Sequence, residues 1–224
     1  MRPMDSIRLA ERTIGGLHNH LLGTVLPEYV QEGMRVVDLG AGSGALALRL
    51  RLELGANIEA VEVDADFFAA DVPLRQLDLN RHDLAQALPG PFDCVLAVEV
   101  IEHVEGPIGF MRAICQSLKP GVHAILTTPN VDNAPARVKF LLTDRVRMMD
   151  EAGDPTHISP IFWDLFVRQY MPRSGLRLVQ HLVYPTEGYL VTRPSYSWMF
   201  KAVARILPGH APYGDNHIIV LTRA

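Results

Sequence analysis

The stretch from Asp38 to Gly44 combines an acid with three glycines spaced two residues apart, Gly40, Gly42 and Gly44, with Ala41 between the first two. Glycine permits sharp turns and has no Cβ to keep a ligand away from the main chain. An apolar stretch precedes the turn and a helix-forming stretch follows it, so the N–H groups that begin the helix can face a ligand. These residues predict a binding turn whose spacing differs from the G-x-G-x-x-G of dinucleotide-binding proteins.

A second acid, Glu62, lies near the end of the next apolar stretch, about 20 residues after the glycine-rich turn. An acid at this place can accept hydrogen bonds from both hydroxyls of a ribose. Glu59 and Asp64 are alternatives, but Glu59 lies earlier in the strand and Asp64 could instead cap a helix around 67–68. We therefore predict that Glu62, with Val63 beside it, binds a nucleoside.

A third group contains acids and histidines and directly follows another apolar stretch: Glu99, Glu102 and His103. At spacings of three and four residues, these side chains would share one face of a helical turn. His157 lies later in the chain, in an expected loop. It is a candidate general base, since imidazole titrates near neutral pH, and its alternative role is to cap the following helix.

The elements that must position these residues alternate between strands and helices. We predict strands at 35–39, 58–63, 74–77, 92–98, 123–128, 176–184 and 217–221, and helices at 45–50, 108–118, 159–173 and 196–207. One or two further helices are expected at the N-terminus, within residues 1–34. Such alternation predicts a doubly wound parallel sheet, whose ligands bind beyond the carboxyl ends of the strands.

Several motifs resemble those of class I S-adenosylmethionine (SAM)-dependent methyltransferases. They are the glycine-rich turn, Phe92-Asp93, Glu99-x-x-Glu102-His103-Val104, Leu118-Lys119-Pro120-Gly121 and Thr128-Pro129-Asn130. The chain is similar to the branch with the ubiquinone-biosynthesis O-methyltransferases and the small-RNA 3′-terminal 2′-O-methyltransferases, most clearly over residues 35–130. The resemblance implies SAM as cofactor and an α/β fold. That fold is a Rossmann-like, doubly wound, mostly parallel seven-stranded sheet with an antiparallel last strand.

The resemblance also implies roles for further cofactor-binding residues. Asp78 and Leu79 match, by position, the acid that binds the adenine amino group and the apolar side chain that contacts the ring. A turn capped by Asn80 and Asp83 is the alternative interpretation of this segment. Val98, at the end of the fourth strand, completes the expected cofactor site.

Both resembled subfamilies carry a metal on matching acids and histidines, which here are Glu99, Glu102, His103 and His157. Two carboxylates and two imidazoles suit Mn²⁺, Fe²⁺, Co²⁺ or Zn²⁺ better than Mg²⁺. A divalent metal there would hold the acceptor's oxygens and lower the pKa of the attacking hydroxyl. In the metal-free alternative, Glu99 lies near the cofactor, His103 orients the substrate, and His157 or His103 is the base.

The composition limits the choice of acceptor and compartment. The 224 residues predict a single SAM-dependent methyltransferase domain, 1–224, with substrate-side insertions at 131–158 and 185–215. The net charge of −4 disfavours RNA, so we expect a hydroxyl of a small molecule as acceptor. The alternatives are the 3′ end of an RNA and a non-catalytic module that binds SAM or a nucleotide.

Cys94 and Cys115 are the only cysteines, and no apolar run reaches the ~20 residues of a membrane span. Without a signal-type apolar core near its start, the chain is expected to be cytoplasmic and to lack a transmembrane segment. The apolar helix expected at 196–207 has three alternative roles, as part of the core, as a substrate lid or as a dimer face.

Overall fold

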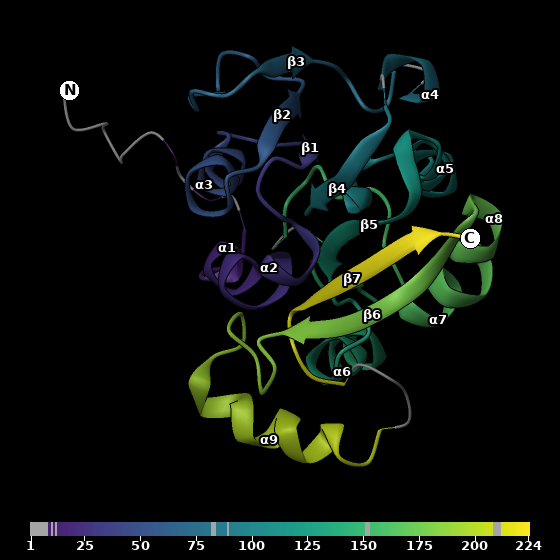
Figure 1. Ribbon diagram of the computed structural model, residues 1–224. Coiled ribbons are helices and arrows are strands. Elements are labelled where there is room, and N and C mark those ends of the chain that lie inside the picture. The colour runs from purple at the N-terminus through teal and green to yellow at the C-terminus, as the bar shows by residue number, and fades with distance from the viewer. Residues whose placement is uncertain are drawn as a thin grey trace.

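The computed structural model describes residues 9, 11, 13–81, 84–88, 90–150, 153–207 and 212–224. At its centre is a seven-stranded sheet with the strand order β3-β2-β1-β4-β5-β7-β6 (Figure 1). The strands are β1 Arg35–Leu39, β2 Asn57–Glu62, β3 Leu74–Gln76, β4 Phe92–Val98, β5 Leu118–Pro129, β6 Leu176–Tyr184 and β7 Asn216–Arg223. Because β7 runs antiparallel to both of its neighbours while the other pairs are parallel, the predicted sheet with an antiparallel last strand is confirmed.

Helices cover both faces of this sheet (Figure 1). The helical segments are α1 Leu17–His20, the π-helical η1 Leu21–Val25, α2 Leu26–Tyr29, α3 Ala45–Leu54, α4 Leu84–Ala87, the 3-10 turn η2 Ile101–His103, α5 Pro107–Ser117, α6 Ala134–Thr143, α7 Trp163–Leu165, the π-helical η3 Phe166–Tyr170, α8 Met171–Ser174 and α9 Pro194–Ala204. The N-terminal helices expected within 1–34 occupy residues 17–29, and residues 1–8 lie outside the described part. None of the described helices is long and apolar enough to cross a membrane.

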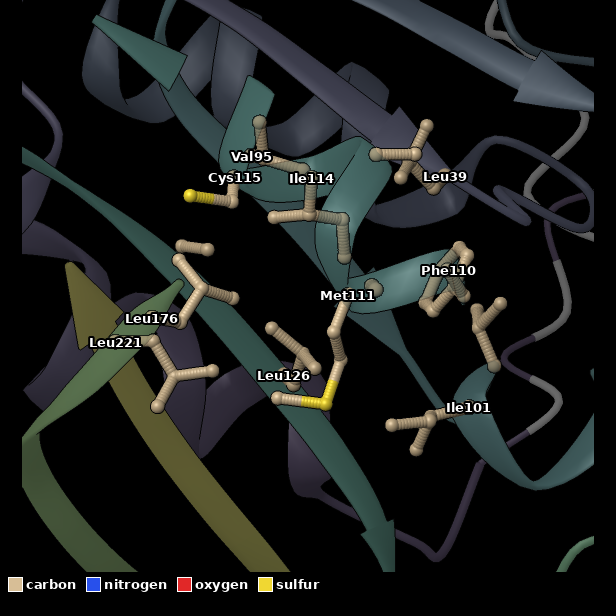
Figure 2. Close-up of a cluster of buried hydrophobic side chains, with 14 of the residues drawn as sticks. Leu39, Val95, Ile101, Phe110, Met111, Ile114, Cys115, Leu126, Leu176 and Leu221 are labelled. Carbon is tan, nitrogen blue, oxygen red and sulfur yellow. The ribbon is translucent and has the colours of Figure 1, made fainter. Parts of the chain in front are cut away.

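Side chains of the central strands alternate between two hydrophobic cores. In β4, Val95 belongs to the core beneath α5, whereas Cys94 and Leu96 belong to the core on the opposite face, with α3 and the N-terminal helices. Figure 2 shows the first core, where Met111 of α5 lies close to Leu126 of β5. Successive strand residues point to opposite faces, so a continuously apolar strand such as β4 requires cover on both sides.

The helix expected to start at 159 begins instead at Trp163, so that prediction is wrong. The Ser159 hydroxyl does not cap a helix, because it donates to the carbonyl oxygen of Val104 at 2.6 Å. The cap comes from a distant segment: the Asp132 carboxylate accepts a hydrogen bond from the N–H of Trp163 at 2.7 Å. The helical run ends as expected at Gly175, which has a left-handed φ of 78°.

Candidate active site

A cavity of about 370 Å³ lies beyond the carboxyl ends of β1, β2, β3 and β4. Residues from the glycine-rich turn and from the ends of these four strands form most of its wall. Of the residues predicted to bind the cofactor, those that line it are Asp38, Gly40, Ala41, Gly42, Glu62, Val63, Asp78, Leu79 and Val98. The fold therefore brings together side chains that the sequence placed at the ends of separate strands.

Gly42 and Gly44 serve different purposes in the turn. Both have left-handed φ angles, 57° and 81°. A Cβ on Gly42 would meet only the ring of Phe67, at 4.0 Å, so this position is open toward the cavity. A Cβ on Gly44 would lie 2.4 Å from the Cβ of Ala70, and Gly44 does not line the cavity. Gly42 therefore leaves room for a ligand, whereas Gly44 leaves room for the protein's own packing.

The Glu62 carboxylate joins the glycine-rich turn to the end of β2. One of its oxygens accepts a hydrogen bond from the N–H of Gly42 at 2.7 Å. The other accepts from the N–H groups of Val63 at 2.8 Å and Asp64 at 3.2 Å. Asp38 is buried near this carboxylate, and burial together with the Glu62 charge raises the pKa of Asp38 to about 7. Two acids thus face one cavity, which favours a cationic ligand.

The two alternatives to Glu62 make other contacts. Glu59 forms an ion pair with Arg75 at 2.7 Å. Asp64 accepts a hydrogen bond from the N–H of Phe67 at 3.1 Å, and residues 65–67 form a turn, so the helix expected around 67–68 is not formed. Neither acid lines the cavity, which leaves Glu62 as the acid best placed for a ribose.

Asp78 caps its own turn, because its carboxylate accepts a hydrogen bond from the N–H of Asn80 at 2.9 Å. The Asn80 side chain links this turn to the segment after β4: it donates to the carbonyl oxygen of His103 at 3.0 Å and accepts from the N–H of Glu105 at 2.8 Å. Asp83, the other cap considered for this turn, lies outside the described residues. The bridging role of Asn80 was not predicted, since it depends on a segment more than 20 positions away.

The acids and histidines after β4 are arranged differently from the single helical face that was predicted. Glu99 has a φ of 56°, in the left-handed region, and the 3-10 turn begins only at Ile101. The Glu99 carboxylate accepts a hydrogen bond from the Thr127 hydroxyl at 2.7 Å. Potential ligand atoms of three other residues lie within 4.8 Å of one another: Glu102, His103 and His157. The structure therefore groups three of the four predicted ligands and places Glu99 beside them.

Hydrogen bonds fix the orientation of both histidine rings. Nδ1 of His103 lies 3.1 Å from the carbonyl oxygen of Thr156, and Nδ1 of His157 lies 2.8 Å from that of Met148. Since a carbonyl oxygen can only accept, both Nδ1 atoms carry a proton, and both Nε2 atoms have a free lone pair in the neutral rings. Metal-binding histidines typically donate their second N–H in this way.

Glu102 is the buried member of this cluster, with 1% of its surface exposed. Neither of its carboxylate oxygens makes a hydrogen bond of normal geometry within the part of the chain that the structure describes, although the Thr128 hydroxyl is near enough to oppose the rise of its pKa. Burial, together with the charge of Glu99, raises the pKa of Glu102 well above its usual value. A buried carboxylate without partners is costly, and a cation held between it and two imidazoles would offset that cost. The donor set therefore fits a divalent metal.

Two further residues, a histidine and a threonine, line the cavity from outside the motifs used for prediction. His18 of α1 is buried and lines the cavity, as does Thr156 of the loop after α6. The Thr156 hydroxyl donates to Asp154 at 2.5 Å and lies 2.9 Å from Nδ1 of His103. No short motif marked Thr156, because its place depends on how the segment between β5 and β6 folds over the end of the sheet.

Comparison with known proteins agrees with this geometry. A family model described as a methyltransferase domain matches residues 12–181. The chain belongs to this family. Similar relatives and solved structures agree with this match, and the chain is a class I SAM-dependent methyltransferase.

Two relatives are named ubiquinone biosynthesis O-methyltransferase. The protein from Xanthomonas campestris pv. campestris (strain B100) is 32% identical over 124 residues, which cover 50% of this chain and 52% of the relative. The protein from Ruegeria pomeroyi is 35% identical over 130 residues, which cover 53% of this chain and 49% of the relative. The methyltransferase chain thus spans about half the length of these relatives.

Solved structures share the fold of this methyltransferase. A SAM-dependent methyltransferase from Archaeoglobus fulgidus matches with a TM-score of 0.61 and 18% identity, covering 98% of this chain and all of that one (100%). A second match is a chain from the complex between the Haloferax volcanii Trm112 methyltransferase activator and a methyltransferase. Its TM-score is 0.64 and its identity 17%, and the match covers 92% of this chain and 88% of that one. At such identities, the likeness shows the fold alone.

Proposed function

We propose that this methyltransferase transfers the methyl group of SAM to a hydroxyl oxygen of a small molecule. The observation that carries the proposal is the cluster of Glu102, His103 and His157, which lies beside the cavity and reaches it through His103. Such a cluster can hold a metal or accept a proton, and a hydroxyl acceptor needs one of these aids.

In the proposed complex, SAM occupies the cavity. Glu62 accepts hydrogen bonds from the ribose hydroxyls, Asp78 binds the adenine amino group and Leu79 contacts the ring. The carboxylate of Asp38 attracts the positive charge of SAM. Gly42 allows the cofactor to approach the main chain, and the remaining contacts come from Gly40, Ala41, Val63 and Val98, with Gly44 supporting the turn.

Methyl transfer is an in-line displacement at carbon, so alignment of the acceptor oxygen behind the methyl group supplies much of the acceleration. Glu102, His103 and His157 would hold a divalent cation, with Glu99 beside them. The bound cation would supply a Lewis acid that lowers the pKa of the acceptor hydroxyl. In its absence, Nε2 of His103 or of His157 accepts the proton.

The test separates cofactor binding from catalysis. Exhaustive chelation should abolish methyl transfer, and added Mn²⁺, Fe²⁺, Co²⁺ or Zn²⁺ should restore it. Glu102→Gln should lose activity and still bind SAM, as measured by isothermal titration. Glu105→Gln, which changes an exposed acid nearby, is the matched control and should keep both properties. Full activity after chelation would show that the reaction needs no metal, and a histidine would then be the base.

The surroundings of α6 favour a small acceptor over RNA. Its cations are engaged within the protein and do not form a free phosphate-binding patch. Arg137 donates to the carbonyl oxygen of Asp132 at 2.7 Å, and Lys139 pairs with Asp150 at 2.5 Å. The names of the relatives also point to a small molecule. We further infer a reducing, cytoplasmic setting from the two buried free thiols.

A further inference from the structure

Helix α9 presents an apolar face to the outside of the molecule. Trp198 is 72% exposed and Ile206, just beyond the helix, is 81% exposed, with Met199 between them also exposed. The opposite face of α9 belongs to the protein, because Ala204 packs with Tyr189 in a small hydrophobic cluster that includes part of α6. Figure 1 shows α9 at the outer edge of the molecule, on the side of α6 and the end of β6. A single exposed apolar residue is ordinary, but a tryptophan and an isoleucine on one stripe are not.

The charge of this segment is opposite to that of the chain. Between residues 188 and 214 there are three cations, Arg193, Lys201 and Arg205, and no Asp or Glu, although the chain carries a net charge of −4. All three are exposed, and none forms an ion pair with a residue that the structure describes. At 100° per residue, Lys201 and Arg205 border the stripe that Trp198 and Ile206 form.

We propose that this outward face of α9 binds the surface of an anionic lipid bilayer. An exposed apolar stripe that contains tryptophan and is bordered by lysine and arginine is the pattern of helices that lie in the membrane interface. The 11 residues of α9 are too few to span a bilayer, so the helix lies parallel to the surface. Lys201 and Arg205 would reach lipid phosphates while Trp198 and Ile206 enter the headgroup boundary.

The charges also argue against a second copy of the chain as the occupant. In a two-fold dimer through this face, the same patch meets itself, and the cations of one copy would face those of the other without any acid from this segment. An anionic surface provides the complementary charge instead.

The experiment mixes the full chain with vesicles of phosphatidylcholine alone or with phosphatidylglycerol, and measures sedimentation with the vesicles. We expect binding to the anionic vesicles only, weakened by salt. Tryptophan emission should shift to the blue on binding, which reports on Trp198 because Trp163 is already buried. The double variant Lys201→Gln with Arg205→Gln should bind about 30-fold more weakly, the effect of two cations near an anionic surface.

Matched variants test whether the effect belongs to α9. Ile206→Ser should lose vesicle binding, whereas Leu52→Ser, which changes an exposed leucine on α3, should not. Likewise Arg168→Gln removes a cation from another surface and should bind like the parent. SAM affinity should be the same in all of these variants.

Three results would overturn the proposal: no binding to anionic vesicles, equal binding to neutral vesicles, or binding that the α9 variants leave unchanged. A concentration-dependent dimer that Ile206→Ser disrupts, with no vesicle binding, would assign the face to self-association instead. Because none of these outcomes depends on methyl transfer, a failure here is distinct from a failure of the proposed acceptor or metal.

Discussion

Gly42→Ala tests the cofactor site with the smallest structural change. The new methyl group would project into the open side of the turn, where only the Phe67 ring approaches, at 4.0 Å. Since the φ of Gly42 is 57°, alanine there costs about 1–2 kcal/mol of unfolding free energy through left-handed strain. The fold should therefore survive, and the methyl group should occupy space that SAM needs.

The expected loss of SAM affinity is on the order of 1–3 kcal/mol, the usual cost of an extra methyl group in a packed site. This corresponds to a roughly 5- to 150-fold higher dissociation constant. Isothermal titration measures the affinity, and urea denaturation measures the strain separately.

Gly33→Ala is the matched control for this prediction. Gly33 also has a left-handed φ, 78°, and nothing lies within 4 Å of its added Cβ, but it does not line the cavity. Its alanine variant should lose a similar unfolding free energy and bind SAM normally. If Gly42→Ala binds SAM as tightly as Gly33→Ala, the cofactor does not approach this turn and the cavity has been assigned to the wrong ligand.

Three further predictions concern charged groups. Glu62→Gln should weaken SAM binding about 5- to 150-fold by titration, because a charged hydrogen-bond acceptor is lost, while Glu59→Gln should not. Near pH 6, SAM binding should release a proton from Asp38, whose pKa is about 7, and the binding heat should then depend on the buffer in the parent but not in Asp38→Asn. Burial holds the pKa of His217 at about 3, below its value of about 6.5 in the unfolded chain. Its contribution to the free energy of unfolding is therefore fully present above pH 6.5 and is lost as the pH falls. Between pH 7 and pH 5 the parent should lose about 2 kcal/mol from this group in urea denaturation, and an equal loss in His217→Gln would contradict the assignment.

Much of the sheet could be predicted from local sequence. The bounds expected for β1, β4 and β6 are those observed, since each strand is a short apolar or alternating run with clear ends. The same pattern predicted that side chains from separate strands would line one cavity, because the carboxyl ends of neighbouring parallel strands meet at one edge. Such features depend on nearest neighbours in the chain and on a common topology.

Features set by distant contacts could not be predicted. The start of α7 depends on Asp132, which lies about 30 positions earlier and replaces the expected Ser159 cap. The left-handed backbone at Glu99 turns its carboxylate toward Thr127 of β5, and no spacing argument along one segment could reveal this. For the same reason, the grouping of Glu102 with His157 had to come from the resemblance and from the fold.

The most direct test of the proposed reaction is to follow the methyl group of radiolabelled SAM into its product. The methyltransferase would be incubated with fractionated cell extract, and the label counted separately in small molecules and in RNA. We predict label in a small molecule as an alkali-stable methyl ether, with none formed by Glu102→Gln although that variant still binds SAM. Label that appears only in RNA, or on nitrogen or carbon of the product, would contradict the proposed O-methylation of a small molecule.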